Sequence, residues 1–175
     1  EVKNKLEYIE KIMVETQEAG VRIIDKTGPL DNPADRDHCI QYMIAVALVF
    51  GRLTADDYED DVAADSRIDQ LRNLMTVSEN KQFSVDYLDA EKRAIGNAIQ
   101  VFYKDGSKSE RVEVNYPIGH RRRRDEGIPV LLKKFRRNLE GHFAAEQLDK
   151  ILCACENHSK LESLPVNEFT DLWVK

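Results

Sequence analysis

The segment PADRDHCIQY, residues 33 to 42, carries the side chains of this chain that best suit binding or proton chemistry. Arg36, His38 and Tyr42 lie close together in it. If the segment is helical, its spacing places His38, Gln41 and Tyr42 on one side. A helix start that also carries an arginine and a histidine can receive a carboxylate or phosphate, because its free N–H groups, its dipole and these side chains all favour an anion.

The same residues also fit an ordinary capped helix. Its polar end would face solvent, and the ring of Tyr42 would pack into the core with its hydroxyl hydrogen-bonded. One histidine without a visible partner does not make a catalytic site. The residue pattern alone therefore leaves both interpretations open.

A second candidate for anion binding is GHRRRRDEGIP, residues 119 to 129, with four consecutive arginines from Arg121 to Arg124. Such a run suggests nucleic acid as a partner. Asp125 and Glu126 follow at once, no aromatic residue interleaves for base stacking, and the net charge is −6, which all weaken that idea. One or two of the arginines could instead clamp a polycarboxylate. A basic loop before a helix is the simplest alternative.

The composition predicts a soluble globular chain in a reducing compartment. Its 175 residues are 42% hydrophobic and 33% charged, and no apolar run approaches the length of a membrane span. The three cysteines, Cys39, Cys153 and Cys155, are odd in number and form no C-x-x-C pair. We therefore expect free thiols, a cytoplasmic location and no zinc or iron–sulfur site.

The helix that would position the first candidate site is marked at both ends. Asn32 is a suitable N-cap, Pro33 fits the first helical position, and Gly51 is a natural stop. The apolar residues between Ile40 and Phe50 wrap most of the circumference, so we expect this half of the helix to be buried.

The remaining elements predict an α+β fold with a small antiparallel sheet and packed helices. Residues 6 to 15 form a predicted strand, and Asp105-Gly106 joins two alternating runs into a predicted hairpin. Thr54 and Asp57 form an approximate capping box at a short helix, and the acidic run after it is expected to be solvated. Further helices are predicted from residues 66 to 75 and through the C-terminal third.

Four long segments carry a family resemblance. They are DNPADRDHCIQYMIAVALVFGRLTADDYED, YLDAEKRAIGNAIQV, VNYPIGHRRRRDEGIPVLLKKF and LPVNEFTDLWV. At colinear positions they resemble the C-terminal part of the MmgE/PrpD family, in the branch that dehydrates 2-methylcitrate to 2-methyl-cis-aconitate during propionate breakdown. Related members decarboxylate cis-aconitate or epimerise iminodisuccinate.

The resemblance implies a subunit of two domains in a homodimeric enzyme without a metal cofactor. It implies that residues 1–140 form an α+β lid domain. Residues 141–175 would be a C-terminal helical segment that docks on an all-helical domain absent from this chain. The family's main catalytic His and Lys positions would lie on that absent domain, so the catalytic residues are unknown here. This chain alone is then expected to be inactive.

The resemblance also implies that the polar start of the helix after Asn32 faces a tricarboxylate substrate. The substrate contacts expected within this chain are Arg36, His38, Tyr42, Arg22 and His120. Neither nucleic acid nor a membrane is an expected partner. The alternatives are a related decarboxylase or isomerase, and a non-enzymatic module that binds anions or nucleic acid through Arg121–Arg124.

Overall fold

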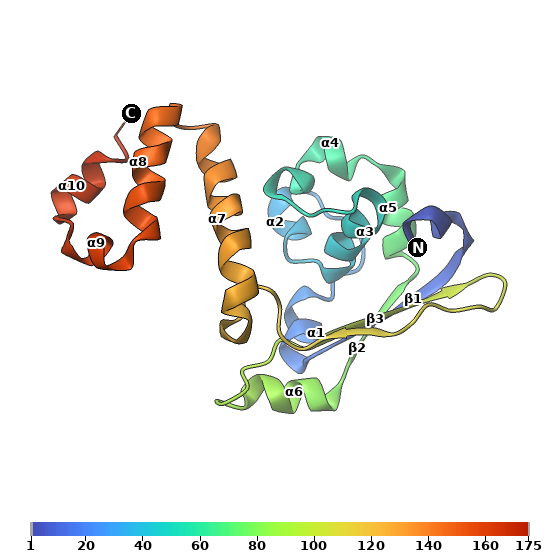
Figure 1. Cartoon of the computed structure of the whole chain (residues 1–175). Helices are drawn as coiled ribbons and strands as arrows, with labels where there is room; N and C mark the ends of the chain where they lie inside the picture. Colours follow the sequence, from blue (N-terminus) through green and yellow to red (C-terminus); the bar gives the residue numbers. More distant parts are fainter. Residues whose placement is uncertain (1, 175) are drawn as a thin grey trace. The chain divides into compact units, whose positions relative to one another are not determined.

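The computed structural model describes residues 2–174 and falls into two compact units, Glu1–Pro117 and Ile118–Lys175. The first unit contains the only sheet among the described residues, and the second contains helices (Figure 1). The predicted α+β class is confirmed. The predicted boundary at residue 140 coincides with the end of a helix inside the second unit, and the docking of residues 141–175 on a further domain stays a prediction.

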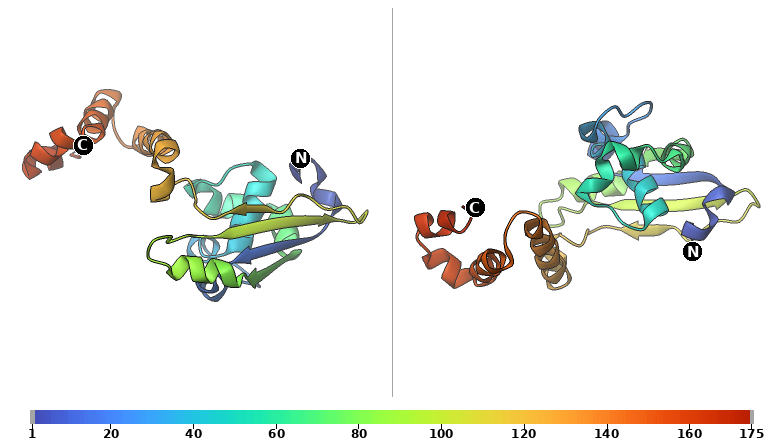
Figure 2. Two further views of the ribbon diagram at one scale, coloured as in Figure 1. Left: turned by 60° about the horizontal axis from the view of Figure 1, so that its bottom comes forward. Right: turned by 90° about the horizontal axis from the view of Figure 1, so that it is seen from above.

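The sheet of the first unit is mixed, with the strand order β2-β1-β3-β4. Its strands are β1 (Ile9–Thr16), β2 (Met75–Glu79), β3 (Asn97–Tyr103) and β4 (Val112–Val114). The prediction of an antiparallel sheet is therefore wrong in one respect: β2 runs parallel to β1, with Val14 opposite Val77. Parallel neighbours need a long crossover, and the helices between β1 and β2 supply it (Figure 2).

The helical elements of the first unit lie before, within and after that crossover. They are η1 (Val2–Tyr8), α1 (Glu18–Ile24), α2 (Pro33–Arg36), α3 (Ile40–Phe50), η2 (Ala55–Tyr58), α4 (Asp60–Ala63), α5 (Ser66–Arg72) and α6 (Lys81–Leu88). In Figure 1, α3 and α5 lie over one face of the sheet.

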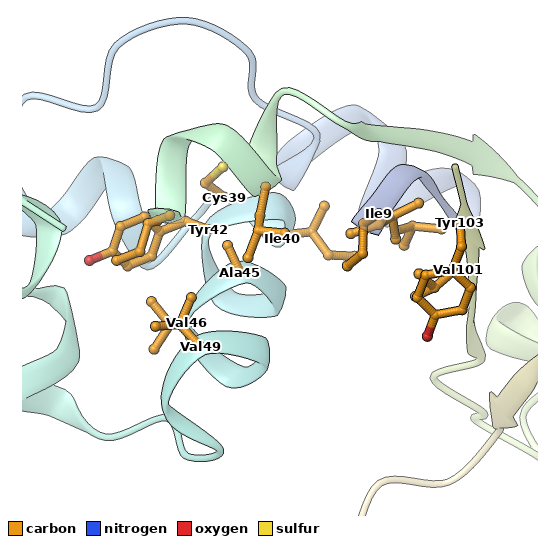
Figure 3. Packing of buried hydrophobic residues seen from close by; sticks show 13 residues of the cluster. Ile9, Cys39, Ile40, Tyr42, Ala45, Val46, Val49, Val101 and Tyr103 are labelled. Atoms are coloured by element: carbon orange, nitrogen blue, oxygen red, sulfur yellow. The ribbon is translucent and has the colours of Figure 1, made fainter. Parts of the chain in front are cut away.

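The core of the first unit joins α3 to the inner face of the sheet. Ile12 and Val14 of β1 and Val101 of β3 are buried against α3 and α5. Figure 3 shows the buried side chains of α3 and of the strands, with Tyr42 pointing away from the strands. The prediction that α3 is buried around most of its circumference holds for one side only: Ala45 and Val46 are fully enclosed, whereas Ala47 is exposed.

The predicted single helix from Pro33 to Phe50 is wrong, because the chain breaks between Arg36 and Ile40. Asn32 caps α2 as predicted, and Gly51 ends α3 with a φ of 72°. Between the two helices Cys39 is extended, with φ −125° and ψ 107°. This bend turns the Cys39 thiol into the core, where it donates to the Lys26 carbonyl oxygen at 3.5 Å.

Elsewhere, the elements that depend on neighbouring residues were predicted correctly, whereas those that depend on residues far along the chain were not. The capping box of Thr54 and Asp57 is present, and the predicted hairpin joins β3 to β4. The predicted helix over residues 66 to 75 ends at Arg72, and Met75 begins β2. The helix α6, which contains Tyr87, was not predicted.

The second unit consists of η3 (Arg121–Arg123), α7 (Arg124–Glu140), α8 (Ala145–Glu156), α9 (His158–Ser163) and α10 (Val166–Asp171). Its core is formed by Leu139, Leu148, Ile151 and Leu152, against which Trp173 packs. The predicted helical C-terminal third is confirmed. No helix within residues 2–174 is long and apolar enough to cross a membrane.

A charged bridge connects β1 to β4 across the sheet. Arg111 donates two hydrogen bonds to Glu15, at 3.0 and 2.7 Å, and a third to Glu113 at 2.6 Å. Asn80 also donates to Glu15 at 2.7 Å. The bonds from Arg111, with those from Asn80, lower the pKa of Glu15 from 4.5 to about 2.

We expect this bridge to make the chain sensitive to acid. A carboxyl with a depressed pKa stabilises the fold fully above its ordinary pKa, and that stability is lost as pH falls from 4.5 toward 2. Because the pair is partly exposed, the loss should be about 1 kcal/mol or less. Glu15→Gln should flatten this part of the pH profile in urea unfolding, and Glu10→Gln, an exposed change on the same strand, should not. Equal profiles for Glu15→Gln and the unmodified chain would contradict the assignment.

Candidate functional site

The polar turn between α2 and α3 is the centre of the candidate site. It contains Arg36, Asp37 and His38, and Tyr42 follows one turn into α3. Because the helix is broken here, the predicted alignment of His38 and Tyr42 on one helix face does not exist. The two side chains have different surroundings: that of His38 is 60% exposed and Tyr42 is 2% exposed.

Arg36 is buried and ties the turn to the following segment. Its Nη1 donates to the Tyr58 carbonyl oxygen at 2.7 Å and lies 2.8 Å from Asp60. Its Nη2 donates to the Leu30 carbonyl oxygen at 3.5 Å. The Nε atom is buried and has no hydrogen-bond partner. An unpaired buried donor costs about 1–3 kcal/mol of stability, and more when the group is charged.

Both the ring and the hydroxyl of Tyr42 make contacts within the first unit. Its ring stacks on Tyr58 with centroids 6.0 Å apart, and its hydroxyl donates to the Asp57 carbonyl oxygen at 2.7 Å. Burial raises the pKa of this hydroxyl. A buried phenol already bonded to the backbone is suited to positioning its neighbours. Its predicted contact with substrate stays a prediction.

His38 is the most accessible of the three predicted residues in this turn. Its Nδ1 contacts the carboxylate of Asp37. A carboxylate on one imidazole nitrogen orients the ring and leaves the other nitrogen for a ligand or a proton. The exposed pair of His38 and Asp37 is therefore the part of the turn best suited to chemistry with an outside molecule.

The other two predicted contacts lie elsewhere in the chain. Arg22 is on α1 with a side chain that is 75% exposed, and it pairs with Glu18 at 3.4 Å. His120 belongs to the second unit, where its Nδ1 accepts a hydrogen bond from the backbone N–H of Arg122 at 3.1 Å and caps η3. The structure does not bring Arg22 into the turn, and both substrate contacts stay predictions.

The predicted basic loop is largely helical. Arg121–Arg123 form η3, and Arg124 begins α7. Arg123 pairs with Glu126 at 2.8 Å, so part of the positive charge is balanced locally.

Arg72 was not predicted as a member of the site. Arg36, Tyr42 and Arg72 line one pocket of about 390 Å³, together with Asp60 and Asp69. Arg72 lies in the segment that was predicted only as a helix over residues 66 to 75. Nothing in the local pattern indicates that its side chain is enclosed. Within residues 2–174, no group of three or more His, Cys, Asp and Glu side chains could hold a metal ion.

Comparison with known proteins identifies the family. The model of the MmgE/PrpD C-terminal domain matches residues 1–158. The chain is similar to a protein named 2-methylcitrate dehydratase from Salmonella typhimurium, at 58% identity, and to one of the same name from Escherichia coli, at 56%. A mitochondrial 2-methylcitrate dehydratase from Yarrowia lipolytica is 55% identical. The chain belongs to the MmgE/PrpD family.

These similarities have a defined extent. Each of the three matches covers 95% of this chain but only 32–34% of the relative. The chain therefore spans about a third of the length of the curated relatives it matches.

We expect the burial of Arg36 to appear in the stability of the chain. Arg36→Met should lower the free energy of unfolding by about 2–4 kcal/mol, because it removes the hydrogen bonds to the Tyr58 and Leu30 carbonyl oxygens and leaves these acceptors unpaired. Arg22→Met, at an exposed ion pair, should change it by about 0.5 kcal/mol or less. Urea unfolding of the two variants measures both values. Equal small effects would show that Arg36 is not a structural clamp.

Proposed function

We propose that this chain is the C-terminal part of a 2-methylcitrate dehydratase, a hydro-lyase that converts 2-methylcitrate to 2-methyl-cis-aconitate, and that the chain alone is inactive. The observation that carries the proposal is the 54–58% identity to six relatives of that name over almost the whole chain. Since the chain covers only about a third of each relative, the remaining parts of the catalytic machinery would lie on the rest of the polypeptide.

The chemistry of the reaction explains which groups are needed. A proton leaves a carbon next to a carboxylate, and a hydroxyl leaves as water. A base, an acid and fixed positive charge near the growing negative charge are therefore required. A tricarboxylate also calls for several cationic contacts. Arg36, His38 and Tyr42 would contribute to these contacts, and Tyr42 would also hold their turn in place.

The remaining predicted contacts and the assembly are parts of the same proposal. Arg22 and His120 would be secondary substrate contacts. The complete enzyme would be a homodimer, and its catalytic domain would be the partner of the 141–175 segment. A cytoplasmic location is proposed, and cell fractionation would distinguish it from the mitochondrial location in the name of the Yarrowia relative.

The direct test uses the complete polypeptide with 2-methylcitrate. We expect 2-methyl-cis-aconitate to form. The absorbance of its new conjugated double bond measures the rate, and mass spectrometry identifies the product. A protein that instead releases carbon dioxide from cis-aconitate, or leaves 2-methylcitrate unchanged, would overturn the proposal.

A single substitution tests the role of the turn. In the complete enzyme, His38→Ala should lower kcat/KM at least tenfold, which corresponds to about 1.4 kcal/mol of transition-state stabilisation. His158→Ala is the matched control, because that histidine is also exposed and also adjoins a carboxylate, that of Glu162 at 3.2 Å. Equal kinetics for both variants, with unchanged melting temperatures, would remove His38 from the site.

A further inference from the structure

Strand β4 has one apolar face, which lies on the same side of the sheet as the core. Its three residues are Val112, Glu113 and Val114, and the alternation of a strand points both valines to one face. Val112 lies opposite Ile99 of β3, and Ile99 lies opposite Val14 of β1. Residues directly opposite one another share a face of the sheet. The two valines therefore continue the inner face, on which Val14 belongs to the core.

The core of the first unit ends before it reaches β4. Val14 is 1% exposed, whereas Val112 and Val114 on the same face are 54% and 43% exposed. The strand β4 is also one edge of the sheet. Native proteins usually cover an apolar edge strand, because it would otherwise pair with other chains. The exposed valines therefore indicate a surface that another segment covers.

A groove lies beside these two valines. Its volume is about 340 Å³, and it is formed mainly by β3, β4 and α3. Ile40, Met43 and Ile44 line it from α3, since residues spaced by three and four share one side of a helix. Among the described residues that line the groove, Asn97 is the only polar one. An apolar side chain can enter it without the cost of desolvating a charge, so the groove suits an apolar segment.

The groove is short, which limits the kind of partner that it can hold. The three residues of β4 correspond to a length of about 10 Å. A separate protein partner usually buries about 800 Å² on each side, which is more than so short a groove provides. A segment of the same polypeptide needs less contact area, because the covalent link keeps it at a high effective concentration. The size therefore favours a segment of the same polypeptide over a second copy.

The relatives are long enough to supply such a segment. The matched family model is that of a C-terminal domain, and this chain covers 34% of the relatives from Salmonella and Escherichia. We propose that the groove between α3 and β4 docks apolar side chains from the part of the complete polypeptide that lies outside this chain. The proposal rests on the groove and on the length of the relatives, and it does not depend on the reaction.

The test compares the rates at which iodoacetamide labels introduced cysteines in the complete polypeptide and in the 175-residue chain. Val112→Cys places a thiol in the groove, and Glu113→Cys, the matched control, places one on the opposite face of the same strand. Peptide mass spectrometry reads the label at the introduced cysteine, so the other cysteines do not interfere. In the complete polypeptide we expect Val112→Cys to be labelled at least tenfold more slowly than Glu113→Cys. In the 175-residue chain the two rates should be similar.

Two results would overturn the proposal. Equal rates for the two variants in the complete polypeptide would show that the groove stays open. Slow labelling of Val112→Cys in the 175-residue chain as well would show that the groove is covered without the rest of the polypeptide. Val114→Cys, which also lies in the groove, repeats the comparison if Val112→Cys does not fold. Because only labelling is measured, the result is independent of the dehydratase assay.

Discussion

The arrangement of the candidate site depends on the burial of one charged side chain, Arg36. A guanidinium group taken out of water must find acceptors, because its desolvation is costly. The carbonyl oxygens of Leu30 and Tyr58 and the carboxylate of Asp60 supply them. The segments at Leu30 and at Tyr58, six and 22 residues from Arg36 in the sequence, are thereby held around one group. Arg36 is the last residue of α2 and lies directly before the bend at Cys39 and the start of α3.

This constraint divides the polar residues of the turn into two kinds. Arg36 and Tyr42 face inward and shape the turn, while His38 faces outward beside Asp37. An accessible histidine that contacts a substrate requires a rigid structural support, because a mobile side chain does not keep its catalytic geometry. Arg72, whose side chain is largely buried, lines one pocket together with Arg36. In the proposed enzyme, this chain would supply one side of a site whose remaining groups lie elsewhere.

Much of the fold could be predicted from sequence wherever local chemistry decides it. The cap at Asn32, the stop at Gly51, the capping box of Thr54 and the turn at Asp105-Gly106 each depend on neighbouring residues, and all are present. The break before α3 and the strand β2 depend on distant partners, so local pattern could not reveal them. The site shows the same division. Its residue types indicated an anion, but the burial of Arg36 and the inclusion of Arg72 are tertiary facts. The family came from long matched segments, not from periodicity.

The most direct measurement is a crystal structure of the complete polypeptide with 2-methylcitrate or citrate bound. The account predicts a ligand carboxylate at the turn between α2 and α3, within hydrogen-bonding distance of Arg36 and His38. A ligand bound without any contact to Arg36 or His38 would contradict it.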